Sequence, residues 1–82
     1  WSDFVFEDDY SLMPLQSLAK FIEKNNHLPE MPTAKEVEAN GISLGEMDAK
    51  LLQKIEELTL YTIEQQKMID ELQKEVKRLK RR

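Results

Sequence analysis

Few side chains in this sequence have the type and spacing that chemistry at a site requires. The single histidine, His27, stands between Asn26 and Leu28 ahead of Pro29, and cysteine is absent. With one histidine, a single chain cannot form a multi-histidine metal site, and without cysteine it cannot form a Cys–His pair. A Ser–His–Asp triad would have to use His27. We expect His27 to be a loop residue hydrogen-bonded to the backbone. The sequence therefore predicts no catalytic residue, no metal site and no cofactor.

Phosphate and calcium loops are also missing from the pattern. The only glycines are Gly41 and Gly45, so no glycine-rich phosphate loop exists. The acidic run Glu7–Asp9 lacks the alternating ligands and the glycine turn of a calcium loop. We interpret that run as a solvated turn, and we expect the chain not to be an enzyme.

The charge is distributed unevenly along the chain. The last nine residues hold six of the 12 basic residues against one acid, Glu75, which gives them a net charge of +5. The remaining six basic residues face 15 acids, so the rest carries −9. The basic end either complements the dipole of a helix or forms a patch for phosphates. A basic-zipper factor has its basic helix before the heptads rather than after them, so we predict no nucleic-acid partner. No apolar run reaches the roughly 18 residues of a membrane span.

The elements that precede the long helix form a small cap over residues 1–43. The segment WSDFVF has the alternation of a short strand, and Pro14 suits the first turn of a helix over about 15–24. Two prolines then indicate an extended loop. The spacings Thr33–Glu36 and Ser43–Glu46 are capping boxes, which predict a short helix over about 34–39 and a long one that begins at 44.

The segment 44–82 contains no proline, and it contains no glycine after Gly45. Its apolar residues recur at alternating steps of four and three, a period of about 3.5 residues that is typical of a coiled coil. We call this stripe the seam, with Leu51 at heptad position d. The seam consists of Leu51, Ile55, Leu58, Thr62, Gln65, Ile69, Leu72, Val76 and Leu79. Thr62 and Gln65 make a polar step that can set register and copy number.

Further apolar residues lie off the seam between Leu44 and Ile63. One interpretation is a wide apolar face that packs against both the partner helices and the cap. The other is an exposed recognition surface. We expect the cap to dock there, because its own helix has an apolar face that needs a partner. The predicted docking residues are Leu15, Leu18, Phe21, Ile22, Leu52 and Leu60. Ile or Val at position a with Leu at d favours two strands, whereas the wide face favours three; we expect a homotrimer, with a dimer as the alternative.

The order of these motifs resembles a C-terminal module of tail-fibre-like, repeat-bearing surface or secreted proteins of Bacteroidota. The resemblance rests on FVFEDDY, HLPEMPTAKEVEANGI and LGEMDAKLLQKIEELTLYTIEQ, which together cover most of the chain. It implies a module at the end of fibrous repeats, outside the cell or on its surface. More distantly, the layout resembles the intramolecular chaperone that ends phage endosialidases and tail spikes. The chain lacks that family's Gly-Phe-Ala-Gln stretch, which argues against self-cleavage.

Taken together, the sequence predicts a mainly α protein. A small helical cap, with one short N-terminal strand, folds back on a long helix that forms a parallel homo-oligomeric coiled coil. The predicted function is non-enzymatic assembly: the module would align and terminate identical chains of a fibrous protein. Two alternatives stay open, an intramolecular chaperone and a docking module for a secretion machine or another partner protein.

Overall fold

The computed structural model describes residues 3–81 as four helical elements. A short 3₁₀ helix, η1 (Asp3–Phe6), is followed by α1 (Leu15–Asn25), α2 (Ala34–Asn40) and α3 (Leu44–Lys80). The fold class is thus mainly helical, and no strand occurs among residues 3–81. α3 has 37 residues, so it is about 55 Å long at 1.5 Å per residue and sets the 62 Å length of the molecule.

The predicted N-terminal strand is wrong. Residues 3–6 form η1 instead, while Trp1 and Ser2 lie outside the described residues. Val5 is only 1% exposed, whereas Phe4 and Phe6 are exposed. η1 packs against α3, so this one valine anchors the N-terminal segment to the long helix. A contact with a distant helix decides the local conformation here, as often happens where a short apolar run has no strand to pair with.

Two N-caps define the starts of α2 and α3, as the sequence predicts. The Thr33 hydroxyl accepts a hydrogen bond from the Glu36 amide, and the Ser43 hydroxyl accepts one from the Glu46 amide, both at 3.1 Å. Each bond satisfies an amide that the helix itself leaves without a partner. Between the two helices Gly41 has φ 68° and ψ 176°, a backbone conformation that only glycine adopts readily.

The proline loop between α1 and α2 contains a tight turn. The Met31 amide donates to the Leu28 carbonyl at 3.2 Å, with Pro29 and Glu30 in the two central positions. Glu30 has φ 64°, which matches the third position of a type II turn, where glycine or asparagine is usual. α1 is capped at its C-terminal end by Asn26, which has the left-handed conformation with φ 59°.

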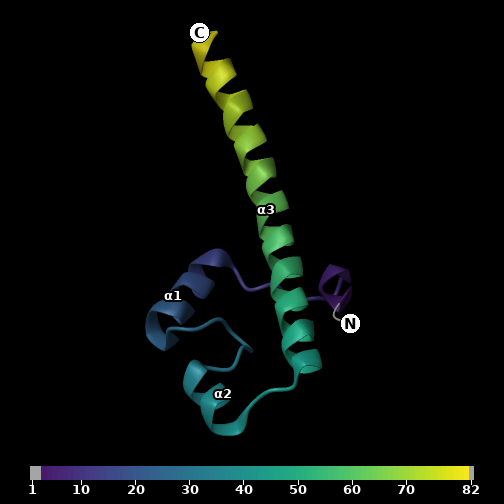
Figure 1. Cartoon of the computed structure of the whole chain (residues 1–82). Coiled ribbons are helices and arrows are strands. Elements are labelled where there is room, and N and C mark those ends of the chain that lie inside the picture. The colour runs from purple at the N-terminus through teal and green to yellow at the C-terminus, as the bar shows by residue number, and fades with distance from the viewer. Residues whose placement is uncertain (1–2, 82) are drawn as a thin grey trace.

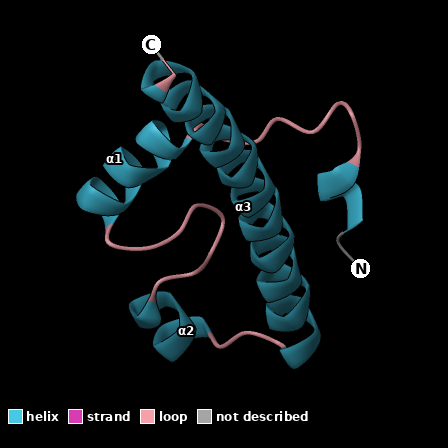
Figure 2. Ribbon diagram, turned by 90° about the horizontal axis from the view of Figure 1, so that it is seen from above, coloured by secondary structure: helices cyan, strands magenta, loops and turns pink. Residues whose placement is uncertain are grey.

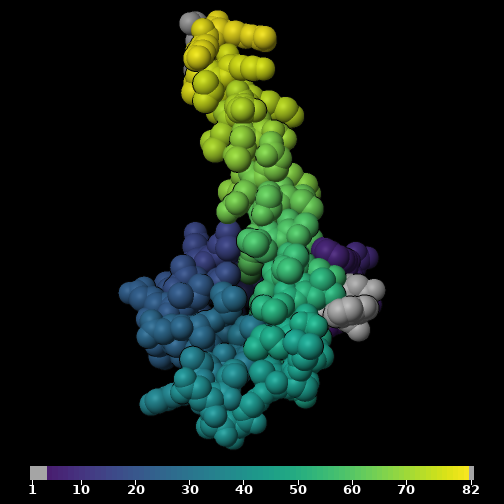
Figure 3. Space-filling model, in the orientation of Figure 1, coloured from purple at the N-terminus to yellow at the C-terminus, as the bar shows by residue number. Residues whose placement is uncertain are grey.

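The cap gathers around one half of α3 and leaves the other half standing free (Figure 1). α1 and α2 lie on one side of α3 and η1 lies on the other, which Figure 2 shows from above. The segment that joins η1 to α1 therefore passes across α3, and we call residues 7–14 the belt. The space-filling view shows the C-terminal half of α3 projecting beyond the cap (Figure 3).

Candidate functional site

The seam is a long apolar stripe that the described part of the single chain leaves uncovered. Each of its apolar members is between 46% and 65% exposed. These members are Leu51, Ile55, Leu58, Ile69, Leu72, Val76 and Leu79. The polar step of Thr62 and Gln65 is exposed as well. A stripe of this length along one helix is unusual for a monomer, whose exposed apolar residues are normally scattered.

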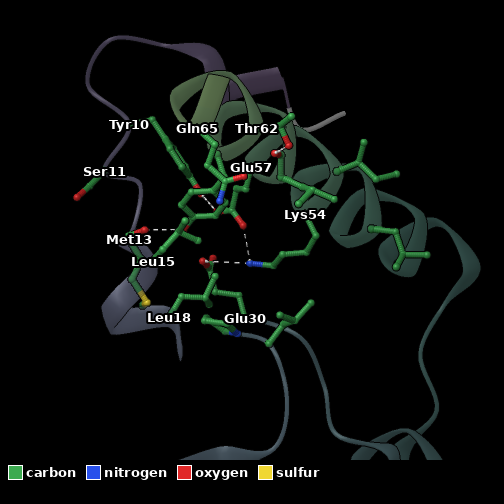
Figure 4. A pocket seen from close by; sticks show the side chains of 16 residues that line it. Tyr10, Ser11, Met13, Leu15, Leu18, Glu30, Lys54, Glu57, Thr62 and Gln65 are labelled. Carbon is green, nitrogen blue, oxygen red and sulfur yellow. Dashed lines mark hydrogen bonds and ion pairs between the residues drawn. The ribbon is translucent and has the colours of Figure 1, made fainter. Parts of the chain in front are cut away.

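A groove of about 420 Å³ separates α1 from the first half of the seam. Leu51, Ile55 and Leu58 form its α3 wall, and Leu15, Leu18 and Leu28 line it from the cap. Figure 4 looks into this groove, with Leu15 and Leu18 on the cap side and Thr62 and Gln65 on α3. No residue of α1 is buried. Leu15 and Leu18 of α1 thus face α3 across an open space.

Two tyrosines fasten the belt to α3. The Tyr10 hydroxyl donates to Glu57 Oε2 and accepts from Gln53 Nε2 at 3.2 Å, and the Tyr61 hydroxyl donates to the Met13 carbonyl at 2.5 Å. Burial raises the pKa of the Tyr10 phenol, and the hydrogen bond to Glu57 raises it further. Burial also raises the pKa of Tyr61, with a smaller contribution from the charge of Glu57. Both phenols are therefore held in their neutral, donating form.

Lysines from α3 hold the proline loop. Lys54 Nζ lies 3.0 Å from Glu57 Oε1 and 3.9 Å from Glu30 Oε1, and these two carboxylates face it from α3 and from the loop (Figure 4). Lys50 Nζ donates to the Glu30 carbonyl at 3.1 Å. Since the loop follows α1 directly, these contacts help to fix how far α1 stands from α3.

The face of α3 turned away from the seam is covered around Gln53 and Glu56. Gln53 and Glu56 are each 8% exposed, and η1 is the element packed against α3. Glu56 Oε1 has no hydrogen-bond partner in the part of the chain that the structure describes. The N-terminal segment therefore occupies one side of α3 while the seam side stays open.

The predicted docking residues fall into three places. Leu15 and Leu18 line the groove, and Leu60 is half-buried beside a second hollow that Leu12 and Met13 also line. Phe21 packs within the cap, and Ile22 is exposed. Leu52 is half-buried on α3. The cap is attached to its own α3 by η1 and the tyrosines, which were not among the predicted residues, and within residues 3–81 α1 does not pack extensively on α3.

His27 has the structural contacts that the sequence predicts. Its Nδ1 lies 2.8 Å from the Leu28 carbonyl oxygen, and its ring meets the edge of Phe21 with the centroids 5.6 Å apart. Within residues 3–81 no group of three or more acidic, histidine or cysteine side chains is arranged to hold a metal ion. None of the helices described there combines the length and the apolarity needed to cross a membrane.

The tyrosine contacts were missed because they join residues far apart in the chain: Tyr10 with Glu57, and Met13 with Tyr61. The one available signal was Tyr61, which lies off the seam on the long helix. A buried tyrosine hydroxyl usually finds a hydrogen-bond partner. Comparison of the chain with protein-family models, curated proteins and solved structures finds no match.

Proposed function

We propose that this chain is a non-enzymatic assembly module in which α3 forms a parallel homo-oligomeric coiled coil. The observation that carries the proposal is the exposure of the seam: all of its apolar residues lie in an unbroken heptad series and are about half exposed in the single chain. Full burial of each leucine or isoleucine side chain contributes roughly 1.5–3 kcal/mol. Association along the seam would bury all of them at once.

Charge placement supports a parallel arrangement. With Leu51 at d, Glu75 takes position g and Lys80 takes position e. In a parallel coil a g residue lies beside the e residue five positions further along the neighbouring helix, so Glu75 of each copy would face Lys80 of the next. In the single chain Glu75 pairs with Arg78, an exposed contact that contributes little and can be exchanged.

Copy number and biological context extend the same proposal. We favour a homotrimer because apolar and aromatic residues adjoin the seam at Met47, Tyr61 and Met68, which widens the face beyond a plain two-stranded zipper. The resemblance to modules of fibrous surface proteins supports a role in aligning and terminating identical chains, outside the cell or at its surface.

The test is molar mass by light scattering over a dilution series. We expect a discrete oligomer, and we expect Ile69→Glu to dissociate it. A carboxylate in the seam would lose an apolar contact and bring like charges together, which corresponds to roughly 3 kcal/mol or more, over a hundredfold in Kd. Ile63→Glu is the matched control, because Ile63 is off the seam yet equally exposed, at 49% against 47%.

Orientation is tested separately by Leu72→Cys. The chain has no cysteine, so this thiol would be the only one. In a parallel coil the d positions of neighbouring chains lie at the same level, and oxidation should link chains in pairs. A chain that remains monomeric at high micromolar concentration, or equal dissociation by the Ile63 and Ile69 variants, would refute the proposal.

A further inference from the structure

The groove between α1 and α3 is built like half of an interface. Its α3 wall is the first half of the seam, and its other wall is formed by Leu15 and Leu18 of α1 together with the belt and the proline loop. Leu15 and Leu28 remain 42% and 40% exposed although they face this space. Lys50 and Lys54 contact the proline loop and Tyr61 contacts the belt, yet α1 itself does not pack extensively on α3, so the described chain does not fill the groove itself.

We propose that α3 of a second copy fills this groove, so that α1 of each protomer packs on the helix of its neighbour. The inference rests on the proposed coiled coil and adds what the cap does in it. The cap becomes an intersubunit clasp: it is fastened to its own α3 through η1 and the belt, and it closes over the neighbouring α3 through α1.

The first reason is the continuity of the seam. The heptad series that leaves Ile69 to Leu79 free beyond the cap continues without a break into the groove at Leu51. α3 is a single helix without an internal proline that runs from the cap to the free C-terminal half (Figure 3), so a neighbour paired along that half would follow the same line toward the cap. In parallel register that line runs through the groove, because Ile55, Leu58 and Thr62 are both seam residues and groove residues.

The second reason is the side of α3 on which α1 lies. Lys54 and Tyr61, both at position g, line the groove, so α1 stands on the g side. In a parallel dimer or trimer the g side of one helix adjoins the e side of its neighbour. The e side of the neighbouring helix is therefore the surface that would come to rest against Leu15 and Leu18.

The third reason is the composition of that e side. Plain zippers usually carry Glu or Lys at position e, where the side chains are solvated. Here the e positions from the cap to the middle of the free half carry no charge: they are Leu52, Thr59, Gln66 and Gln73. Small or neutral side chains at these positions let an apolar helix cover them without burying an unpaired charge. The chemistry of the occupant that the groove fits is thus that of this chain's own α3.

A matched pair of variants on α1 tests the clasp. Leu15→Glu would place a carboxylate in the groove, whereas Ile22→Glu changes a residue of similar exposure, 40% against 42%, that does not line it. We expect Leu15→Glu to raise the Kd of the oligomer roughly tenfold to a hundredfold, although it lies outside α3, and Ile22→Glu to change it less than about threefold. Equal effects of the two variants would overturn the clasp.

Disulfide trapping tests the same contact without relying on destabilisation. The double variant Leu18→Cys/Thr59→Cys places one thiol on the cap and one at position e. Thr59 lies about 160° around α3 from Tyr61 and the groove's g side, so a bond within one chain is disfavoured. We expect oxidation to give covalent oligomers only when both cysteines are present. The largest covalent oligomer should contain two chains for a dimer and three for a trimer. Each single variant serves as a control.

Failure of the clasp is distinguishable from failure of the proposed function. If the chain assembles through the seam, as the Ile69 and Ile63 variants report, but the double cysteine variant gives only an intrachain bond or no bond, the clasp is refuted and the coiled coil stands. If the unmodified chain is monomeric throughout the dilution series, both are refuted.

Discussion

The two glycines of the chain should respond to alanine with opposite signs. Gly41 sits between α2 and α3 with φ 68° and ψ 176°, and a β carbon added there would meet nothing within 4 Å. The cost of Gly41→Ala is therefore purely a backbone cost, of about 1–3 kcal/mol. Gly45 lies in the first turn of α3 and also has open space around it. Gly45→Ala should stabilise the helix by about 0.5–1 kcal/mol.

The assay is urea unfolding followed by far-ultraviolet circular dichroism, with every variant at the same chain concentration because association contributes to stability. The two variants should differ by roughly 1.5–4 kcal/mol in unfolding free energy. Gly41→Asn is a useful third variant. Asparagine tolerates the left-handed region, but there ψ is near +30° to +60°, so it should not rescue a residue with ψ 176°. A Gly41→Ala protein as stable as Gly45→Ala would refute the described turn.

Three further predictions follow from the cap. Ser43→Ala should lower the free energy of unfolding by about 1 kcal/mol through loss of the N-cap bond, whereas His27→Gln should change neither that value nor the response of the melting temperature to zinc. Raising the pH above about 10 should destabilise the fold, because the raised pKa values of Tyr10 and Tyr61 mean that the unfolded chain loses these protons first. The stability that these two neutral phenols contribute is fully present below the pKa of tyrosine in the unfolded chain, and it is lost as the pH rises through their pKa values in the folded chain. In unfolding curves taken across this pH range, the free energy of unfolding of a Tyr10→Phe/Tyr61→Phe protein should therefore depend less on pH. Glu30→Gly should raise stability by a few tenths to about 1 kcal/mol in the same urea assay, since it relieves φ 64° and gives up only a long ion pair from an exposed side chain; a loss above 1 kcal/mol would show that the pair matters more than the backbone.

The sequence predicted helix boundaries well where they depend on interactions between residues close together in the chain. The boxes at Thr33 and Ser43 gave the starts of α2 and α3, because a hydroxyl that caps an amide three residues on needs no distant partner. The absence of proline and the heptad spacing predicted a helix that runs to Lys80. α1 and α2 each end one residue beyond the predicted boundary, at Asn25 and Asn40, which is the usual scatter of helix ends.

The arrangement of the cap could not be read in the same way. Alternation in a six-residue segment predicted a strand, yet Val5 is held by α3, which is far away in the sequence. The positive φ of Glu30 has no residue-type signal, because glutamate rarely occupies that turn position. The groove lies between α1 and α3, next to the tyrosine and lysine contacts that join the belt and the proline loop to α3, and these contacts link residues far apart in the sequence. Periodicity indicates that an apolar face needs cover, but it does not say whether the cover comes from the same chain.

The one-sided covering of α3 bears on whether assembly would stop. η1 packs on α3, and Gln53 and Glu56, opposite the seam, are buried, so the apolar stripe that α3 leaves exposed, the seam, forms one arc along one side of the described chain. Units with one such arc close into point-group symmetric particles of fixed size, whereas units with two arcs on opposite sides can grow into filaments. By covering one side of α3, η1 would thus limit the size of the assembly. Val5→Asp, which should release η1 from α3, is expected to turn a single mass in light scattering into a broad distribution that increases with concentration, whereas an unchanged sharp mass would show that closure is imposed elsewhere.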